Sequence, residues 1–483
     1  MLIKIIKSFF LTMLIISSSV STILAASSTF NYVINDFNFY QTPDIPKPEK
    51  GVPIEDPTFN TSITRITDSS TEVSGSTYDY AQPGYPKHNI ENADGTMLVI
   101  QSYSSTGWHL YNANPPYNKI KDIPTTILNY SDPEVRWDND SPNILYAHKG
   151  PILYQWDVKT GDITMLHDFS KDFPGEEIDY ISMGEEGDAS DDRRYWAFYT
   201  TSSESSTQSH LIVYDKLQDK IVSKIDRGAG TFKTGETSFN DGVWLRDRGS
   251  GNVLNYNSVG MSPSGAYVVT GFPPTWVYPR DFSSSRIIDT HGHVDCAIDD
   301  EGREVVFWVG TYFGPNNNEN YGYWAMMADL ETGGVNYLGP FGNIQIFHAS
   351  GNAHDKPGWA LVSSYNPMDC GIPTQWADAS IIVYELTRKI SKPTWDYHAI
   401  TWRVAHVHMC RERYSDDPFA KFNKKGTKIF FGSGWGTSVN NGPYDVYQIE
   451  LPSNWNEDLT GDIEPPSPSS ISPSPPRNLK LKN

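Results

Sequence analysis

The chain has 483 residues, with 38 Lys or Arg against 58 Asp or Glu, which gives a formal net charge of −20 at pH 7. This balance argues against a nucleic-acid binder, because neutralising phosphates needs a surplus of cations. The mean hydropathy of −0.48 excludes an integral membrane protein, while 38% hydrophobic residues are enough for a core. Aromatic residues reach 13%, and 37 Gly and 33 Pro punctuate the chain, which is typical of strands and turns.

Residues 1–26 are predicted to be a secretory signal peptide. Lys4 and Lys7 precede an apolar run from Phe9 to Ile16, and small residues stand at Ala25 and Ala26. The alternative is an uncleaved anchor, for which the apolar run is short, and no later segment holds about 18 uninterrupted apolar residues. We therefore expect a secreted or periplasmic protein with no membrane span.

Two Pro-rich segments flank the expected domain. Residues 27–58 are predicted to form an irregular N-terminal arm along the surface, and residues 453–483 a tail, in which 11 of the 12 residues from 465 to 476 are Pro or Ser. The folded part, residues 59–452, should end near Pro452. The three cysteines, Cys296, Cys370 and Cys410, allow one disulfide in three possible pairings, so disulfides do not define this fold.

The middle of the chain repeats a unit of about 50 residues, made of a short strand, a tight turn, a hydrophobic strand, a loop and two further strands. Seven turns mark the units, and a strand follows each of them. The turns lie at residues 93–96, 138–140, 190–192, 262–265, 300–302, 355–358 and 424–426, and the strands at 97–101, 144–147, 195–200, 266–270, 304–309, 359–363 and 428–432. Units of four short antiparallel strands are typical of a β-propeller.

We therefore predict an all-β fold, a seven-bladed β-propeller closed by an N-terminal strand. The segment from Ser62 to Asp68 precedes the first complete unit, and we expect it to supply the outer strand of the last blade. The competing interpretation is a β-sandwich or two smaller β domains. Neither explains a repeat carried through about 390 residues.

A propeller gathers the beginnings of its innermost strands around one mouth of the central channel, where function usually resides. Seven of the 12 histidines lie between His291 and His408. We expect His293, His348, His406 and His408 to hold one divalent metal ion, zinc before manganese or calcium, at about 2.0 to 2.2 Å from each nitrogen. Cys296 or Cys410 could replace one imidazole. The alternative is that these histidines are hydrogen-bonded fillers of a narrow channel.

Several chemistries lack the residues they need. Gly-x-Ser-x-Gly is absent, and the nearest sequence, residues 432–436, follows a predicted strand without a helix, which argues against a serine hydrolase. Residues 190–196 look like a sialidase Asp-box without its glycine and are interpreted as a turn. Glu185 and Glu186 are adjacent carboxylates, but neighbours on a strand point to opposite faces and cannot flank one glycosidic bond.

The sequence resembles secreted seven-bladed propeller polysaccharide lyases, of the oligogalacturonate lyase and ulvan lyase type, over most of residues 60–452. Three stretches carry the resemblance: Tyr-Pro-Lys-His-Asn at 85–89 with a second histidine 21 residues after His88, Gly-His-Val-Asp at 292–295, and Arg-Val-Ala-His-Val-His at 403–408. In ulvan lyases an early histidine pair, helped by a Tyr and an Arg, is implicated in catalysis. In oligogalacturonate lyases histidines and a Gln hold a metal, and Arg403 stands where that Gln would be.

The resemblance implies β-elimination on an acidic, ulvan-like polysaccharide by a monomeric enzyme. His88 and His109 would act as base and acid in an unassigned order, Tyr180 would help proton transfer, and Arg136 would pair with the uronate carboxylate. Trp108, Tyr312 and Arg403 would contact the sugar chain, although single aromatics are as well explained by core packing. The net charge of −20 opposes a polyanion at long range.

Two other functions fit the same sequence. A non-catalytic, TolB-like propeller would bind a protein or a glycan, with a metal ion tying three blades together. A propeller glycoside hydrolase would leave a saturated reducing sugar in place of an unsaturated uronate. The product formed from a uronate polymer separates the three functions.

Overall fold

The structure is a computed structural model that describes residues 32–460 apart from short gaps. The gaps are 74–77, 103–106, 130–133, 203–207, 227–231, 235–236, 244–257, 272–273, 291–292, 313–321, 343–346, 366–368 and 391, and only the backbone is described at 232–234 and 237–243. The expected signal peptide, His291 and most of the expected tail lie outside the described residues.

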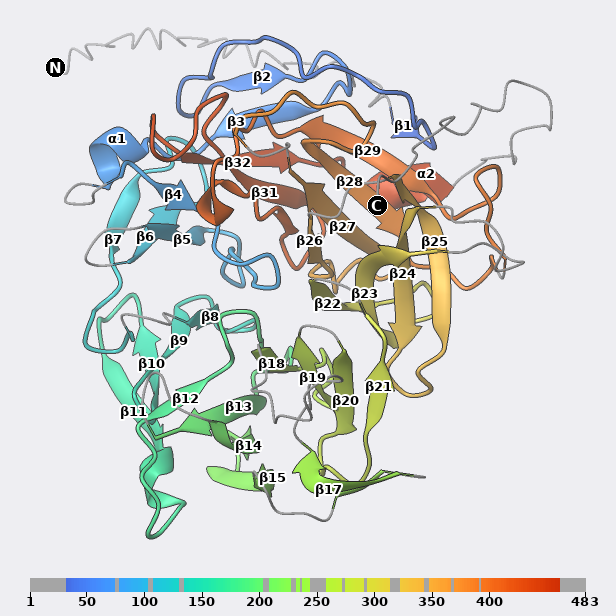
Figure 1. The fold of residues 1–483 in the computed structure, drawn as a ribbon. Coiled ribbons are helices and arrows are strands. Elements are labelled where there is room, and N and C mark those ends of the chain that lie inside the picture. Colours follow the sequence, from blue (N-terminus) through green and yellow to red (C-terminus); the bar gives the residue numbers. More distant parts are fainter. Residues whose placement is uncertain are drawn as a thin grey trace, which may run out of the picture.

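Seven antiparallel sheets stand around a central channel, and the chain visits them in order around the ring, from blue to red in Figure 1. In each sheet the first strand is innermost and the following strands lie successively further out. Blade 1 contains β4 (Ala81–Gln82), β5 (Met97–Ser102), β6 (Trp108–Asn112) and β7 (Lys119–Asp122); blade 2 contains β8 (Val135–Trp137), β9 (Ile144–Lys149), β10 (Ile152–Asp157) and β11 (Ile163–Asp168); blade 3 contains β12 (Tyr180–Ser182), β13 (Tyr195–Thr201), β14 (Gln208–Asp215) and β15 (Lys220–Asp226).

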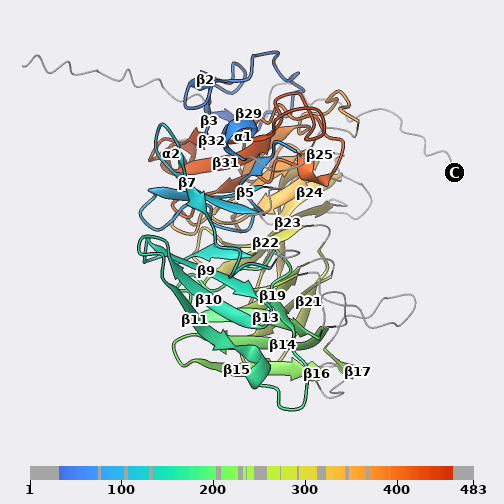
Figure 2. The same ribbon diagram turned by 90° about the vertical axis from the view of Figure 1, so that its left-hand side faces the viewer.

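The remaining blades follow the same plan, which confirms the predicted seven-bladed propeller. Figure 2 shows the ring from the side. Blade 4 contains β18 (Ser258–Met261), β19 (Tyr267–Gly271), β20 (Thr275–Pro279) and β21 (Arg286–Ile288); blade 5 contains β22 (Val294–Ile298), β23 (Glu304–Thr311), β24 (Tyr323–Asp329) and β25 (Val335–Gly342); blade 6 contains β26 (Phe347–Ser350), β27 (Trp359–Ser364), β28 (Ser380–Glu385) and β29 (Thr401–His406); blade 7 contains β30 (Lys421–Phe422), β31 (Lys428–Ser433) and β32 (Asp445–Glu450). A separate hairpin, β16 (Phe232–Thr234) and β17 (Thr237–Val243), follows blade 3.

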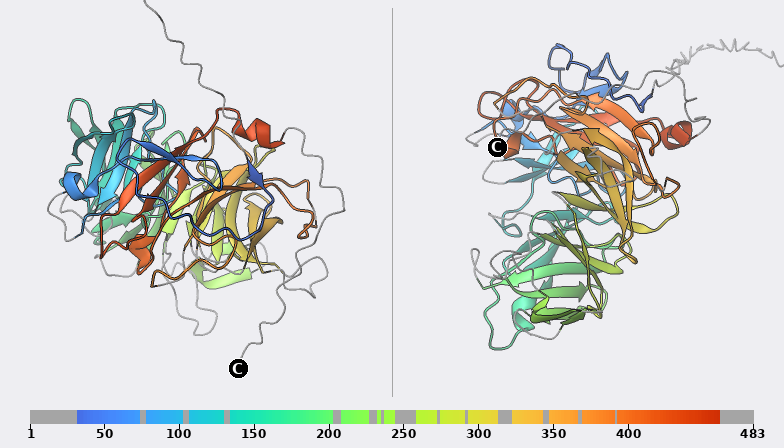
Figure 3. Two further views of the ribbon diagram at one scale, coloured as in Figure 1. Left: turned by 90° about the horizontal axis from the view of Figure 1, so that it is seen from above. Right: turned by 45° about the vertical axis from the view of Figure 1, so that its right-hand side comes forward.

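The N-terminal segment closes the ring, as predicted. Strand β3 (Ser62–Arg65) pairs with β32 through Ile63 and Ile449, and so supplies the fourth strand of blade 7. The preceding arm adds β2 (Pro53–Glu55) beside β3, and β1 (Val33–Ile34) beside β29 of blade 6. The arm therefore crosses the outer edges of two blades, where Figure 3 shows it in blue.

The folded region extends further than the predicted end near Pro452. Helix α2 (Trp455–Thr460) follows it, and the side chains of Trp455 and Leu459 are fully buried against blades 6 and 7. The Trp455 ring lies 5.4 Å from that of Trp402. One further short helix, α1 (Ser69–Glu72), and two 3-10 turns (Phe169–Lys171 and Tyr414–Asp416) complete the described structure. No helix among the described residues is long and apolar enough to cross a membrane.

The core is divided into layers between neighbouring blades. Leu361, Trp402 and Phe431 pack between blades 6 and 7, and Phe307, Met327 and Tyr384 between blades 5 and 6, with similar clusters at the other interfaces. Each fully buried large side chain contributes about 1.5 to 3 kcal/mol to stability. Because this packing fixes each blade against the next, residues far apart in sequence hold fixed positions around the channel.

Candidate functional site

Two predicted metal ligands, His293 and His348, lie side by side at the channel. His293 immediately precedes β22, and His348 is the second residue of β26, so the innermost strands of adjacent blades carry them. Their ring centroids are 4.5 Å apart. The propeller thus brings together two imidazoles that are 55 positions apart, as the repeat predicted.

Tyr85 joins this histidine pair from the opposite side of the channel. It lies on the segment that follows β4 of blade 1, and its hydroxyl is 2.5 Å from Nδ1 of His293. Its ring centroid lies 5.4 Å from that of His348. Burial, followed by the charge of Glu186, raises the pKa of Tyr85 well above its ordinary value, so the phenol keeps its proton at neutral pH.

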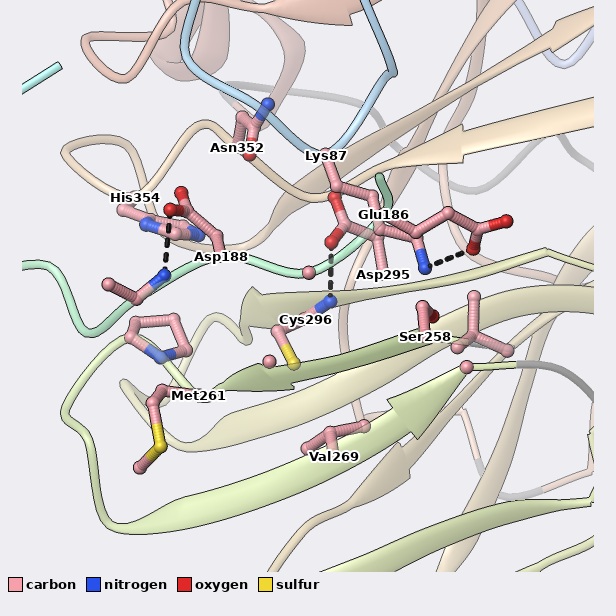
Figure 4. A pocket seen from close by; sticks show the side chains of 16 residues that line it. Lys87, Glu186, Asp188, Ser258, Met261, Val269, Asp295, Cys296, Asn352 and His354 are labelled. Carbon is pink, nitrogen blue, oxygen red and sulfur yellow. Dashed lines mark hydrogen bonds and ion pairs between the residues drawn. The ribbon is translucent and has the colours of Figure 1, made fainter. Parts of the chain in front are cut away.

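Glu186 supplies a buried carboxylate to the same group. Its Oε2 accepts a hydrogen bond of 2.9 Å from Nζ of Lys87, and its Oε1 lies 3.6 Å from Nδ1 of His293. Figure 4 shows the contact between Lys87 and Glu186. Burial alone would raise the pKa of Glu186, but Lys87 and His293 outweigh it and hold this pKa far below its usual range. We call Tyr85, Glu186, His293 and His348 the channel cluster.

A second charged group borders His348. Nε2 of His348 lies 3.5 Å from Oδ2 of Asp417, and Nε of Arg411 donates a 2.5 Å hydrogen bond to Oδ1 of the same carboxylate. Burial raises the pKa of Asp417 to about 6, although Arg411 opposes this shift. Tyr414, from the same connection, lies 5.7 Å from the His348 ring and is 52% exposed. An exposed tyrosine beside the cluster offers a surface for a sugar ring.

Glu185 faces the channel from the loop after β12. Its backbone is left-handed with φ of 60°, and its amide donates a 2.7 Å hydrogen bond to Oε1 of the buried Glu134. Burial, with the charges of Glu134 and Glu186, raises the pKa of Glu185 to about 7. Glu185 and Glu186 lie in a loop and not on a strand. The alternation of side chains along a strand, which was expected to point them to opposite faces, therefore does not apply to them.

A small hollow continues from Lys87 and Glu186 toward blades 4 and 5 (Figure 4). Asp295 and Cys296 line it, and the Asp295 carboxylate accepts hydrogen bonds from the amides of Cys296 (2.8 Å) and Gly351 (2.6 Å). Burial raises the pKa of Asp295 to about 6 and that of the Cys296 thiol well above its ordinary value. The thiol is therefore protonated at neutral pH.

Three of the residues predicted to be catalytic, His88, Arg136 and Tyr180, lie on innermost strands or directly beside them. Both ring nitrogens of His88 are buried and make no hydrogen bond among the described residues. Burial and the neighbouring Arg136, Lys421 and Lys87 hold the pKa of His88 well below its ordinary value, so it is neutral. Arg136 donates through Nε to the Gly187 carbonyl at 3.1 Å. Tyr180 begins β12 at the channel and is partly exposed.

His109 does not meet His88, which contradicts their predicted pairing. It lies on β6, the third strand of blade 1, where Nε2 is 2.6 Å from the Ser102 hydroxyl and Nδ1 is 2.6 Å from Asp122. Both ring nitrogens of His109 are therefore in contact with side chains of blade 1. Its neighbour Trp108 packs between blades 1 and 2.

The other predicted sugar contacts also serve the fold. Tyr312 is 5% exposed, stacks on Tyr337 at 4.2 Å, and donates its hydroxyl proton to the Pro393 carbonyl at 3.1 Å. Arg403 donates to the carbonyls of Asn38 (2.7 Å) and Trp376 (2.6 Å) and so fixes the N-terminal arm. Trp108, Tyr312 and Arg403 are all buried in the structure, and their contact with a substrate stays a prediction of the sequence.

His406 and His408 are also separated from the channel cluster. β29, which ends at His406, is the fourth strand of blade 6, and pairing from His348 through Ser363 and Ile381 to Ala405 crosses three strand spacings, about 14 Å. His406 contacts Asp56 of the arm at 3.0 Å. His408 stacks on Trp435 at 4.0 Å. The sequence repeat had placed this outer strand at the channel.

The donors do not fit the expected metal site of four histidines. Cys410 forms a disulfide with Cys370, so it is not a spare ligand. Among the described residues, three donor side chains within 4.8 Å of one another occur only at Cys370, Cys410 and Glu412, two of which are joined by that disulfide. In the part of the chain that the structure describes, no third imidazole has a nitrogen within 4.8 Å of the donor nitrogens of both His293 and His348. A bound metal ion stays a prediction of the sequence.

Several site residues were missed in the sequence. Tyr85 and Lys87 precede His88 in the Tyr-Pro-Lys-His-Asn stretch, but the stretch assigns no role to them. Glu186 is interpreted from the sequence as a strand residue that points away from Glu185. Arg411 and Tyr414 follow His408 closely, but nothing in the sequence showed that this connection returns to the channel. The positions of these residues depend on loop paths, which a strand repeat does not specify.

Comparison with known proteins agrees with the architecture. No family model matches the chain, and no curated protein matches it. A solved oligogalacturonate lyase from Vibrio parahaemolyticus is similar in structure, with a TM-score of 0.53 and 13% sequence identity over 84% of this chain and 97% of that one. At this identity the likeness shows the propeller fold alone.

Proposed function

We propose that the protein is a polysaccharide lyase that cleaves a uronic-acid-containing chain by β-elimination at the channel cluster. The observation that carries this proposal is the position of His293. Its Nδ1 faces both the Tyr85 hydroxyl (2.5 Å) and the ionised Glu186 (3.6 Å), while 25% of its side chain is exposed to the channel. A supported imidazole open to solvent is what abstraction of a weakly acidic carbon-bound proton requires.

His293 is the base in this proposal. With the Nδ1 proton assigned toward Glu186 and Tyr85, Nε2 keeps its lone pair for the C5 proton of the uronate. Glu186, held ionised by Lys87, stabilises the imidazolium that forms, as a carboxylate does in other histidine-based sites. The base thus has an orienting partner, and that partner has its own counter-ion.

Cations near the cluster stabilise the charge that develops on the substrate. Removing the C5 proton places negative charge on the uronate carboxylate, and Lys87 and Arg411 lie on opposite sides of the imidazole pair. The protein carries −20 overall, but at physiological salt the Debye length is about 8 Å. Screening of the distant surface charges therefore leaves the groups at the channel itself to set the potential that a bound polymer meets.

Three finer points remain expectations from the sequence. An ulvan-like substrate and export through the signal peptide are expected from the resemblance and from residues 1–26. We assign no step to a metal ion, because the described donors do not form the expected set. The structural neighbour, an oligogalacturonate lyase, supports a uronate substrate only through its shared fold.

The test incubates the protein with a panel of uronate polymers and follows the near-ultraviolet absorbance of the unsaturated product. His293→Gln removes the base and should lower kcat by about 10²- to 10⁴-fold. His109→Gln is the matched control, because both ring nitrogens of that histidine contact side chains of blade 1, and the variant should keep its kcat at a temperature where it is folded. An unchanged rate in His293→Gln, or no unsaturated product from any polymer, would overturn the proposal.

A second function is favoured by one observation. Glu185 has a raised pKa of about 7 and Glu186 a lowered one, and two carboxyl groups driven apart in this way are typical of the acid and base of a glycoside hydrolase. Lys87 and His293 occupy the Glu186 carboxylate, however, which favours the lyase. A reducing-sugar assay that rises without near-ultraviolet absorbance would support the hydrolase. Polymer binding without any cleavage would support a non-catalytic propeller.

A further inference from the structure

We propose that Glu185 is the acid that protonates the departing glycosidic oxygen. This proposal rests on the proposed lyase function, and it adds the group that completes the reaction. β-Elimination needs a proton on O4 as the C4–O4 bond breaks, and none of the four residues of the channel cluster was assigned that task. The Glu185 side chain is exposed to solvent, and Glu185 directly precedes Glu186, the partner of the base.

The backbone at Glu185 is held in a conformation that side chains rarely adopt. Its φ of 60° lies in the left-handed region, where glycine is the usual residue, so the surrounding contacts must hold a conformation that is unfavourable for glutamate. The Cα atoms of Glu185 and Glu186 are about 3.8 Å apart, as in any pair of consecutive residues. The left-handed backbone at Glu185 also turns the chain sharply just before Glu186. Both carboxylates raise the pKa of Tyr414, after the larger effect of burial, so both lie within electrostatic range of Tyr414.

A buried carboxylate holds this loop in place. Glu134 is 1% exposed and accepts hydrogen bonds from the amides of Met183 (2.9 Å) and Glu185 (2.7 Å). His148 contacts the other oxygen of Glu134 at 2.7 Å, and Asn129 contacts His148 at 3.0 Å. Burying a charge is costly unless it is well partnered, and here two of the partners of Glu134 are backbone amides of the loop before Glu186. We regard Glu134 and His148 as positioning residues.

The protonation state suits an acid. The groups that face Glu185 are the carboxylates of Glu134 and Glu186 and the guanidinium of Arg136. Burial and the two carboxylates raise the pKa of Glu185 to about 7, while Arg136 lowers it. A carboxyl group with this pKa is protonated for a large share of the time near neutral pH and still releases its proton readily.

The step balances as follows. His293 takes the C5 proton, the electrons of that C–H bond form the C4=C5 double bond, and the C4–O4 bond breaks with its electron pair on O4. Glu185 gives its proton to O4, so the new chain end leaves as an alcohol. The carboxylate of Glu185 recovers a proton, and the His293 imidazolium loses one, through the solvent of the channel.

The test compares two substrates whose leaving groups differ in the need for an acid. One is a uronate oligosaccharide with a sugar at O4, and the other is a uronate glycoside with fluoride at C4, whose leaving group needs no proton. Glu185→Gln should lower kcat on the oligosaccharide by about 10²- to 10³-fold and leave the fluoride substrate within a few fold. His293→Gln should lose activity on both. Glu177→Gln, an exposed residue of the connection that precedes β12, is the control and should match the parent protein on both substrates.

Each other outcome overturns the proposal in a recognisable way. Equal losses on both substrates mean that Glu185 is needed for structure, and an unchanged rate on the oligosaccharide means that another group is the acid. Glu185→Asp, which keeps the acid but shortens its reach, should fall between the parent and the glutamine variant on the oligosaccharide alone. If the parent protein eliminates neither substrate, the proposed lyase function is wrong. If the parent is active on both substrates but Glu185→Gln does not behave as expected, only the role of Glu185 is wrong.

Discussion

At the scale of single residues, the proposed site contains two adjacent glutamates whose pKa values are shifted in opposite directions. Glu186 is paired with Lys87 at 2.9 Å and stays ionised, while Glu185 faces Glu134 and Glu186 and takes up a proton more readily than usual. The difference arises from neighbours and not from residue type, because both side chains are the same acid. In the proposed mechanism, Glu186 therefore orients the base, His293, while the adjacent Glu185 supplies the acid.

This difference predicts how stability depends on pH. The folded pKa of Glu185 is about 7, above the ordinary value of 4.5, so the native state binds more protons between these values. Its contribution to stability is therefore present at low pH and is lost as the pH rises through about 7. Glu185→Gln should raise the free energy of unfolding at pH 8 by about 1 kcal/mol relative to pH 5, after allowance for solvent screening.

Urea denaturation of both proteins at pH 5 and pH 8 measures this effect. Glu177→Gln serves again as the control and should show the same small difference at both pH values. A glutamine variant that is less stable than the parent at pH 8 would show that the ionised Glu185 has a partner, contrary to the contacts described.

Which residues could be foreseen depended on what each position requires. His293 and His348 were predicted together because both stand at the start of an innermost strand, a position that the repeat specifies. Tyr85, Lys87 and Glu186 lie in loops, whose paths the repeat does not specify. Their contacts with one another and with His293 follow from the relative positions of blades 1, 3 and 5, which only the folded structure defines.

At the scale of elements, the connection from β29 to β30 carries much of the charged group beside His348. It holds Arg411, Tyr414 and Asp417 within seven residues, and the Cys370–Cys410 disulfide ties it to the loop between β27 and β28. The amide of Cys370 also donates a 3.2 Å hydrogen bond to the Arg411 carbonyl. The crosslink is therefore adjacent to a residue that the proposed mechanism uses.

Removing the disulfide should weaken substrate binding more than the chemical step. Its cysteines are 40 positions apart, and closing such a loop contributes about 3 to 4 kcal/mol by the chain-entropy estimate. The double variant Cys370→Ser, Cys410→Ser should melt at a lower temperature and show a KM raised several fold, with a smaller change in kcat. Reductant should shift the parent toward the double variant and leave the double variant unchanged. If reductant affects both proteins equally, its action lies elsewhere.

The same region explains why the element prediction failed for His406 and His408. Blade 6 has long connections between β27 and β28 and between β28 and β29, so its outer strand begins only at Thr401. The sequence pattern counted that strand as the start of the seventh unit. The turns and the hydrophobic strands were predicted well because they are set by local residues, whereas the length of a connection is not.

At the scale of the whole molecule, the N-terminal segment both closes the ring and covers its last two blades. β3 completes blade 7, and Ile63 is fully buried in the layer between blades 6 and 7. β1 and β2 add outer strands, and Asp56 accepts hydrogen bonds from the His406 amide (2.9 Å) and contacts its ring (3.0 Å). The closing strand and the covering strands are adjacent in sequence and can be removed separately.

Two truncations should therefore behave differently. A chain that starts at residue 60 loses β1, β2 and the contact between Asp56 and His406, so it should unfold at a lower temperature but in one cooperative transition, with the channel cluster intact. A chain that starts at residue 67 also loses β3, which leaves the edge of β32 unpaired and removes the buried Ile63, a loss of about 2 to 5 kcal/mol from that side chain alone. Calorimetry should then show no single transition.

Ile63→Asp in the full chain is the matched variant for the longer truncation. It keeps every residue of the arm but places a charge in the layer between blades 6 and 7, where a buried unpaired carboxylate is strongly unfavourable. It should resemble the chain that starts at residue 67 and not the one that starts at residue 60. Equal melting behaviour of the two truncations would mean that the ring closes by blade packing without β3, since only the ring-closing strand distinguishes them.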